Sequence, residues 1–466
     1  MKRFLENDFL LDNRIAEELY RNAASELPIV DYHNHLDPVS LAIDHQCENI
    51  ADLWVTSDPY KHRAMRINGI PEHFISGDAS PKEKYLQWAK TLPKTIGNPL
   101  FHWSCAELKY VFGINEVLNE SNAESIWDRC NRQIAEQSLS VRHILKLWKT
   151  ETICTSDDLM DNLSQHIKAS QYDDGLNVLP SLRGDSMIAF GSPAYAVWQE
   201  KLSEHYGNVN NLYDYLDAIV CRLNIFNETG CRLADHSLDA GFVFMLPAER
   251  EADRIFEKRI NGQSLCLDEL QALQSYLLVL LGVEYAKRGW TLQLHIGAQR
   301  FTSSRLRASA GAAGGYACIG STCDVNGLCG FLDALEQKNG LPNIILYTLN
   351  PADNAVMASL TGSFTADHTA GKIQFGPAWW FNDNLDGIHQ QLTVLSGYGL
   401  LSRFVGMTTD SRSVLSFSRH DYFRRILCNM IGGWVENGLV PNDRPLLEQV
   451  ISDISYHNAE KMILNN

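Results

Sequence analysis

The feature that most constrains the fold is a series of eight short apolar runs, rich in β-branched and aromatic residues, most of which end on polar residues. Stretches long enough for a crossover helix separate most of them. Strands that alternate with helices predict a parallel sheet, and eight such units predict a closed (β/α)8 barrel, with an open doubly wound sheet as the alternative. The runs are Pro28–His35, Thr152–Thr155, Asn177–Arg183, Cys231–His236, Trp290–Gly297, Asn343–Asn350, Lys372–Trp380 and Phe404–Arg412.

One interval breaks this rhythm. About 115 residues with several helical patterns separate the first two runs, which is far longer than an ordinary connection in a compact domain. We therefore predict a mainly helical insertion over residues 37–145. The barrel is then built from residues 1–36 and 146–466.

The amino-acid composition limits the kinds of partner that the protein can bind. The chain carries 40 basic and 56 acidic residues, a formal charge of −16, and such a field repels nucleic acid. No apolar stretch approaches the ~20 residues of a membrane helix, and the N-terminus lacks the apolar core of a signal peptide. We expect no nucleic-acid partner, no membrane partner and a cytoplasmic location, and a homo-oligomer is compatible with the sequence. Eleven cysteines without a Cys-x-x-Cys pair argue against a disulfide framework or a zinc ribbon.

Polar side chains follow the first, fifth and eighth runs, at the end of a barrel that carries active sites. His33 and His35 lie two residues apart in a strand, so their imidazoles project to the same side and can reach one metal ion. His295 closes the fifth run, and Asp410 lies near the end of the eighth. His-x-His alone has a plain alternative, a pair of pore-lining histidines, but these four groups together predict a mononuclear metal site.

Arginines and tryptophans also lie at strand ends. Arg183 and Arg412 close the third and eighth runs, where a guanidinium group binds a carboxylate with two hydrogen bonds. A salt bridge with a neighbouring acid is the alternative for each arginine. Trp379 and Trp380 close the seventh run, where an aromatic wall packs against a sugar, although core packing is an alternative for either ring.

The longer motifs around these residues are similar to those of the uronate isomerase (glucuronate isomerase) family of the metal-dependent amidohydrolase superfamily. The resemblance covers essentially the whole chain. The most specific stretches are residues 29–35, 60–61 with 63–66, 98–100 with 102–103, 371–376 with 379–381, and 400–407 with 409–413.

The resemblance implies that the enzyme interconverts D-glucuronate with D-fructuronate, and D-galacturonate with D-tagaturonate. It also implies zinc, or manganese or cobalt in its place, held near His33, His35 and Asp410. Around the hexuronate substrate it implies the side chains of Tyr60, Arg183, Asp235, His295 and Arg412.

This chemistry is a proton transfer through an enediol. The hydrogen on C2 is acidic because it neighbours the C1 aldehyde, and a metal ion, the Tyr60 hydroxyl and Arg412 are suited to stabilise the negative oxygen. Arg183 would hold the C6 carboxylate. Asp410 is the favoured base by position, although a carboxylate is intrinsically weak, so His295 or a metal-bound water stays an alternative.

The chain departs from the family pattern at three places. Pro59 stands where a histidine is common, Gly184 where a proline follows the arginine, and Phe301 where asparagine is usual. Two rival functions therefore stay open: a mononuclear amidohydrolase acting on an amide or lactone, and a sugar-acid-binding relative with weakened catalysis. The glycine-rich residues 311–315 match no phosphate-binding loop and are interpreted as a mobile loop or lid.

Overall fold

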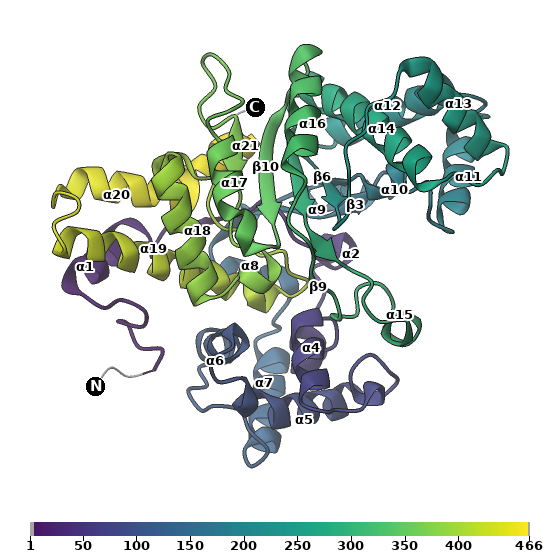
Figure 1. The fold of residues 1–466 in the computed structure, drawn as a ribbon. Coiled ribbons are helices and arrows are strands. Elements are labelled where there is room, and N and C mark those ends of the chain that lie inside the picture. The colour runs from purple at the N-terminus through teal and green to yellow at the C-terminus, as the bar shows by residue number, and fades with distance from the viewer. Residues whose placement is uncertain (1–3, 465–466) are drawn as a thin grey trace.

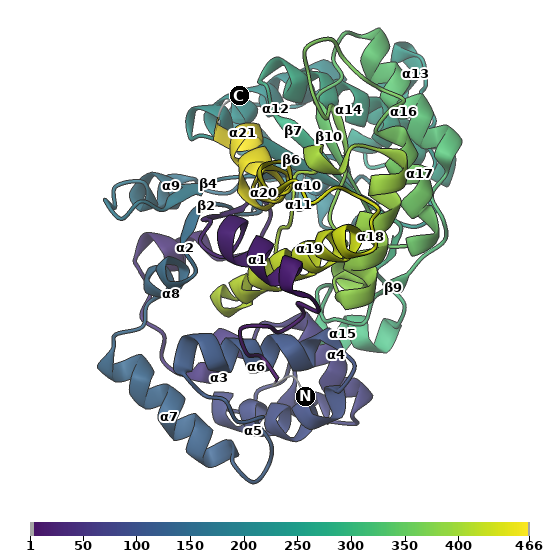
Figure 2. The same ribbon diagram turned by 90° about the vertical axis from the view of Figure 1, so that its left-hand side faces the viewer.

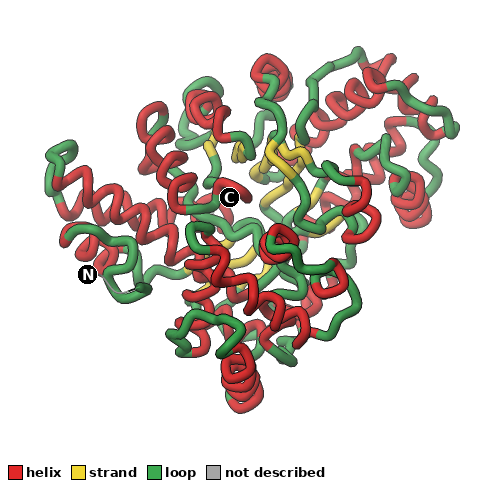
Figure 3. The backbone as a smooth tube through the Cα atoms, turned by 60° about the horizontal axis from the view of Figure 1, so that its bottom comes forward, coloured by secondary structure: helices red, strands yellow, loops and turns green. Residues whose placement is uncertain are grey.

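Strands lie near the centre of the molecule with helices around them, as Figure 3 shows. Nine of these strands form parallel pairs that follow one another in a ring. The structure is a computed structural model that describes residues 4–464. The strands of the ring are β1 (Ile29–Asp31), β2 (Thr150–Cys154), β3 (Asp157–Asp158), β4 (Asn177–Leu179), β5 (Leu182–Arg183), β6 (Leu233–Leu238), β7 (Thr291–Ile296), β10 (Asn343–Thr348) and β11 (Ile373–Phe375). A separate antiparallel pair is formed by β8 (Ala298–Gln299) and β9 (Cys318–Ile319).

The strands follow one another around the ring in chain order. Two hydrogen-bonded sheets, β1-β2-β4 and β3-β5-β6-β7-β10-β11, contain parallel pairs only. After short breaks β2 continues into β3 and β4 into β5, and backbone bonds such as Thr155 N–H to Leu179 O (3.1 Å) link them across the gap. The predicted (β/α)8 barrel is confirmed. Seven of the eight predicted runs contain strands of this barrel.

The eighth predicted run is not a regular strand, which corrects the prediction of a strand over Phe404–Arg412. Gly406 (φ +86°) and Asp410 (φ +48°) both take left-handed backbone conformations, which interrupt an extended chain. The segment still lies beside β1 and closes the barrel. The amide of Asp410 donates to His33 O at 2.9 Å, and the amide of His35 donates to Ser411 O at 2.8 Å.

The seventh predicted run is also too long. β11 ends at Phe375, and the chain then turns, with Trp379 in an irregular segment and Trp380 in the 3-10 helix η4. Trp380 has a positive φ of +53°, which no strand tolerates. The two tryptophans therefore lie beyond the strand end and not on the strand itself.

Helices connect and cover the strands. Outside residues 37–145 the helices are α1 (Arg14–Ala23), α9 (Ser164–Ala169), α10 (Asp185–Ile188), α11 (Tyr195–Tyr206), α12 (Leu212–Glu228), α13 (Glu249–Ile260), α14 (Leu267–Lys287), α15 (Ser304–Ala310), α16 (Val325–Gln337), η3 (Pro351–Asp353), α17 (Asn354–Leu360), η4 (Trp380–Asn382), α18 (Leu385–Tyr398), η5 (Leu401–Arg403), η6 (Val414–Phe417), α19 (Ser418–Glu436), α20 (Arg444–Ser452), the π-helical turn η7 (Asp453–His457) and α21 (Asn458–Leu464). None of the helices within residues 4–464 is long and apolar enough to cross a membrane.

Helices also fill the interval between β1 and β2. They are α2 (Pro38–Ala42), α3 (Ile50–Trp54), α4 (Pro59–Ile67), η1 (Glu72–Phe74), α5 (Pro81–Thr91), η2 (Leu92–Thr95), α6 (Pro99–Phe112), α7 (Ala123–Glu136) and α8 (Val141–Leu147). Helices α4, α5, α6 and α7 lie together, below the rest of the molecule in Figures 1 and 2. Their buried residues join the same core as the barrel, and the division into residues 37–145 and the rest stays a prediction.

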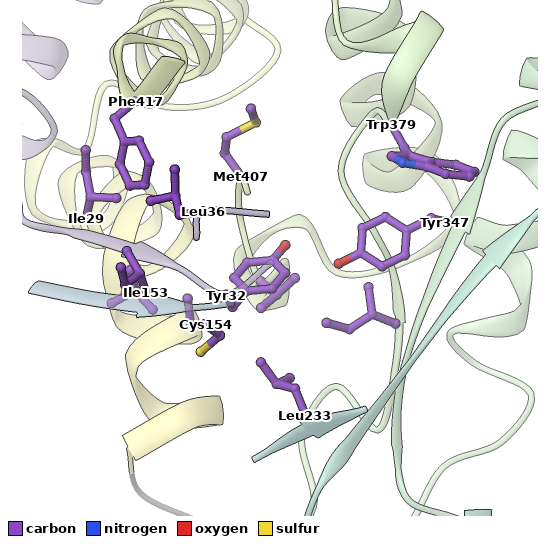
Figure 4. Packing of buried hydrophobic residues seen from close by; sticks show 14 of the residues in the cluster. Ile29, Tyr32, Leu36, Ile153, Cys154, Leu233, Tyr347, Trp379, Met407 and Phe417 are labelled. Atoms are coloured by element: carbon purple, nitrogen blue, oxygen red, sulfur yellow. The ribbon is translucent and has the colours of Figure 1, made fainter. Parts of the chain in front are cut away.

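Large apolar side chains fill the barrel interior. Figure 4 shows Tyr32 and Tyr347 facing each other across it, with Leu233 below Tyr32 and Trp379 above Tyr347. Both tyrosines are at most 1% exposed. The interior is thus a packed core that supports the polar end of the barrel rather than an open pore. All eleven cysteines are free thiols, as the sequence predicts.

The glycine at the closing segment yields a stability prediction. A side chain at Gly406 would adopt a positive φ of +86° and place Cβ 2.2 Å from Ile454 O. We expect Gly406→Ala to lower the free energy of unfolding by at least about 1–3 kcal/mol, measured as a lower thermal midpoint. The matched control is Gly433→Ala in α19, where nothing lies within 4 Å and a helix gains about 0.5–1 kcal/mol. Equal midpoints for the two variants would contradict the assignment.

Candidate active site

A cavity of about 670 Å³ opens at the C-terminal ends of the barrel strands. Its wall contains nearly every residue that the sequence singled out for chemistry. Those residues are His33, His35, Tyr60, Arg183, His295, Trp379, Trp380, Asp410 and Arg412. Asp235 alone among the predicted residues is absent from the wall, because it is fully buried beneath it.

Two imidazoles and one carboxylate converge in this cavity. His35 Nε2 lies 3.0 Å and His33 Nε2 lies 3.5 Å from the same oxygen, Asp410 Oδ1. The three side chains place ligand atoms within 4.8 Å of one another. Asp410 has a positive φ, so the residue at which the eighth run departs from strand geometry also contributes a ligand atom to this cluster.

The cluster is electrostatically coupled. Burial raises the pKa of Asp410, but hydrogen bonds from His33 and His35 outweigh it and hold the pKa well below the usual range. Burial lowers the pKa of His35 to about 4, because the bond to Asp410 only partly offsets it. The carboxylate therefore stays ionised and His35 stays neutral near pH 7, which is the state in which both bind a cation.

A second trio of ligand atoms shares His33. Asp235 on β6 and His295 on β7 also place atoms within 4.8 Å of His33. Both carboxylate oxygens of Asp235 and the Nε2 atom of His295 are buried without a hydrogen-bond partner. Unpaired buried polar atoms are costly, so these groups fit a site that receives a further ligand.

Buried polar groups below the cluster hold it in place. The hydroxyl of Thr408 accepts a bond from the His33 amide at 2.9 Å and donates to Asp31 Oδ1 at 2.8 Å. The other oxygen of Asp31 accepts from the Thr409 amide at 3.1 Å and contacts His420 Nε2 at 3.1 Å. Asp31 thus joins β1 to the closing segment immediately beside two of the ligand residues.

Tyr60 enters the cavity from outside the barrel. It lies in the first turn of α4, whose N-cap Asp58 accepts from the amides of Tyr60 and Lys61. Its ring packs 5.9 Å from the buried guanidinium of Arg419, which ion-pairs with Asp383 at 2.7 Å. Burial raises the pKa of the Tyr60 phenol, so it stays a hydrogen-bond donor.

The two predicted arginines have different surroundings. Arg183 lies 3.1 Å from Asp185 and 4.0 Å from Asp235, so the salt-bridge alternative holds for it. Arg412 is exposed to the cavity and makes no ion pair or hydrogen bond with any residue in the range 4–464. Arg412 therefore supplies an unneutralised positive charge.

The two tryptophans also differ. Trp379 is 5% exposed, and its indole nitrogen donates to Asp410 Oδ2 at 3.0 Å, so it packs in the core and orients a ligand residue. Trp380 is half-buried and lines the wall. A third arginine, Arg300, stands 5.9 Å from the Trp380 ring. Sequence patterns assigned no role to Arg300, because it lies three residues beyond the end of the predicted fifth run, in a segment without periodicity.

The predicted mobile loop packs against α4. Arg63 donates to Ala317 O at 2.9 Å, and Arg66 donates to Gly314 O. A Cβ at Gly315 would lie 2.3 Å from Pro59 O, so the loop needs a glycine to touch α4. Pro59 occupies the first helical position, where its fixed φ suits a helix start, and lies in the cavity wall.

A second departure from the family pattern, Gly184, is explained by packing. Gly184 leaves room for the ring of His236, because a Cβ there would lie 2.1 Å from the imidazole. A proline at this position would meet the same obstruction. The ring of His236 is fully buried and contacts the Tyr285 hydroxyl at 2.9 Å.

A divalent metal fits the donor set. Two imidazoles and a carboxylate are the common ligands of zinc and similar ions, and open positions at such a site face substrate. His33, His35 and Asp410 would hold the ion, with His295 and Asp235 beside it. The three side chains approach one another closely around a carboxylate that forms no ion pair with a lysine or arginine among residues 4–464, and this observation supports the fit.

The comparisons with known proteins agree on one family. The family model described as glucuronate isomerase matches residues 1–463. The chain is 44% identical over 463 residues to the uronate isomerase of Caldanaerobacter subterraneus subsp. tengcongensis, and 45% identical over 463 residues to that of Caldicellulosiruptor bescii, covering 99% of each protein in both cases. The crystal structure of uronate isomerase from Thermotoga maritima aligns with a TM-score of 0.93 at 32% identity, over 99% of this chain and 100% of that one.

More distant structures share the fold alone. A putative metal-dependent hydrolase from Lactobacillus casei aligns with a TM-score of 0.55 at 12% identity, over 95% of this chain and 96% of that one. A (β/α)8 barrel with a histidine–aspartate cluster at the C-terminal ends of its strands defines the class of barrel enzymes that carry a candidate metal site at that end. Within that class, the chain belongs to the glucuronate isomerase family.

The buried hydrogen bonds of Thr408 below the ligand cluster lead to a testable prediction, and the neighbouring Thr409 provides the control. Thr408→Val removes the hydroxyl between His33 and Asp31, leaving a buried amide without an acceptor, at a cost of about 1–3 kcal/mol. We expect a lower thermal midpoint and weaker metal retention on dialysis. The Thr409 hydroxyl is buried without a partner, so Thr409→Val removes no bond and should match wild type. Similar losses in both variants would refute the role of the Thr408 hydroxyl.

Proposed function

We propose that this uronate isomerase interconverts D-glucuronate with D-fructuronate, and D-galacturonate with D-tagaturonate, by proton transfer through an enediol. The observation that carries the proposal is one cavity that combines the His33–His35–Asp410 cluster with an unpaired guanidinium, Arg412. A hydrolase of amides or lactones needs the cluster but has no need of the arginines. A sugar acid needs both, because one end reacts and the other carries a carboxylate.

Different residues of the cavity are assigned to different steps of the isomerisation. A divalent ion, zinc or alternatively manganese or cobalt, supplies Lewis acidity that makes the hydrogen beside a carbonyl more acidic. Asp410 is assigned to the C2 proton by its position, with His295 as the alternative. The proton leaves C2, a proton is delivered to C1, and the hydroxyl proton moves from O2 to O1, so aldose becomes ketose without an external oxidant.

The surrounding groups stabilise charge and orient the sugar. The Tyr60 phenol and the Arg412 guanidinium donate to oxygen as it becomes negative, where preorganised donors contribute most. Arg183 is assigned to the C6 carboxylate, and Asp235, 4.0 Å from Arg183 and in one ligand trio with His33, is assigned to a sugar hydroxyl. Trp380 presents a flat face to the sugar, while Trp379 fixes Asp410.

Metal removal tests the cluster. We expect chelation followed by dialysis to abolish isomerisation of D-glucuronate in a coupled assay, and zinc, manganese or cobalt to restore it. His35→Ala should bind less metal by elemental analysis, while His389→Ala on the exposed face of α18 should retain it. Full turnover by protein that contains no measurable metal would rule out this part of the proposal.

Solvent isotope labelling tests the reaction type. Conversion in deuterated water should place deuterium on the carbon next to the carbonyl, because the transferred proton exchanges with solvent. Asp410→Asn should lower kcat by about 100-fold or more, the contribution of a general base. Asp386→Asn, an exposed acid on α18, should leave kcat unchanged. Complete retention of the original hydrogen would point to hydride transfer, and hydrolysis of amides or lactones without isomerisation would favour the rival class.

A further inference from the structure

We infer that Arg419 is a positioning residue, which holds the Tyr60 side chain where its hydroxyl can donate to a substrate oxygen as that oxygen becomes negative. This inference rests on the proposed function and adds to it a residue that lies outside the cavity wall. Arg419 lies in the first turn of α19 and is 3% exposed. It therefore acts on the reaction through Tyr60 and not by touching the sugar.

The guanidinium group of Arg419 joins four segments of the chain. Its Nη1 donates to Asp383 Oδ2 at 2.7 Å, and its Nη2 donates to the carbonyl oxygen of Thr409. The same group lies 4.8 Å from the Trp103 ring and 5.9 Å from the Tyr60 ring. The two oxygens belong to the barrel, whereas the two rings belong to helices α6 and α4 of the interval between β1 and β2. Arg419 therefore fixes these inserted helices to the closing segment of the barrel.

The orientation of the Tyr60 ring depends on these contacts. The ring lies edge-to-face on Trp103, with centroids 6.1 Å apart and an angle of 80° between the planes. A guanidinium over an aromatic face is attracted by the negative charge of that face, so Arg419 holds both rings at once. Helix α6, which carries Trp103, lies against α19, below it in Figure 2. Tyr60 reaches the cavity wall from this packed position.

The stability of α19 does not explain an arginine at this position. A helix N-terminus carries partial positive charge, so a cation in the first turn is unfavourable for the helix itself. A buried ion pair adds little net stability, because the cost of removing both charges from water offsets their attraction. The Nε atom of Arg419 is also buried without a hydrogen-bond partner. Three of the four groups that the guanidinium contacts line the cavity or a small void that shares Tyr60 and Asp410 with it.

Paired substitutions test whether Arg419 acts through Tyr60. Arg419→Lys keeps a positive charge beside Asp383 but loses the planar fork and its flat face. We expect it to lower kcat for D-glucuronate about 10- to 100-fold with KM unchanged, because a donor displaced by about 1 Å loses that much. Tyr60→Phe should lower kcat about 100- to 1,000-fold, as the loss of one oxyanion donor does. The double variant should match Tyr60→Phe alone, because a displaced ring without a hydroxyl has no further donor to lose.

The control is a second buried arginine of the same helix. Arg425 is ion-paired with Asp421 at 2.7 Å and lies 4.2 Å from the Tyr20 ring, but it is outside the cavity wall. Arg425→Lys should lower the thermal midpoint about as much as Arg419→Lys and leave kcat unchanged. Equal effects of the two variants on kcat would show a purely structural role. Both variants should keep their metal by elemental analysis, and metal loss in Arg419→Lys alone would overturn the inference by tracing its effect to the ligand cluster.

The outcomes separate this inference from the proposed function. Losses in kcat that multiply in the double variant overturn the inference, while Tyr60 keeps its role in the reaction. An unchanged kcat in Tyr60→Phe removes Tyr60 from the proposed mechanism, and the inference with it. Hydrogen exchange decides the case in which D-glucuronate is not isomerised at all. The amides of residues 59–67 should then exchange faster in Arg419→Lys than in wild type or Arg425→Lys, and equal exchange in all three overturns the inference.

Discussion

The closure of the barrel between β1 and residues 404–412 is the constraint on which the functional end of the molecule depends. His33 and Asp410 are separated by most of the chain, and they meet only because the Asp410 amide donates to His33 O and the Thr408 hydroxyl bridges the His33 amide to Asp31. These bonds are buried, where an unmade hydrogen bond costs more than a made one contributes. A different register between β1 and residues 404–412 would leave several of these buried groups without hydrogen-bond partners. The bonds therefore favour one register.

That junction explains why the last segment departs from strand geometry. In a regular strand, side chains alternate between faces, and sequence alternation alone placed Asp410 in the barrel mouth. The chain instead adopts a left-handed conformation at Asp410, and the carboxylate of this residue lies 3.5 Å from His33 and 3.0 Å from His35. Local backbone strain at such a position is characteristic of a functional site. The segment lacks the regular hydrogen bonding of a strand, and its Asp410 side chain lies at the two histidines.

The sequence could predict those features of the structure that depend on residues close together in the chain. Apolar runs of period two and glycine or basic helix ends are local, so seven strands and the helical interval could be predicted from residues alone. Residues that lie a fixed step from a strand end, such as His33, His295 and Arg183, were placed at the cavity by the same local rule. Arg300 obeys no such rule, because its place depends on Ser237 and Asp239 from a neighbouring strand. The contact between the glycine-rich loop and Pro59 likewise depends on tertiary packing that no periodicity encodes.

The charge of the cavity reconciles an acidic protein with an acidic substrate. The chain as a whole carries a formal charge of −16, which at long range opposes a carboxylate. Screening limits such forces to about 8–10 Å at physiological ionic strength, so the groups that matter are those in the wall. There, Arg412 is unpaired and Arg300 is only partly neutralised, whereas the acids Asp185 and Asp235 are held by Arg183 or buried below. The wall of the cavity therefore combines a local excess of positive charge with a candidate cation-binding cluster, in a chain whose net charge is negative.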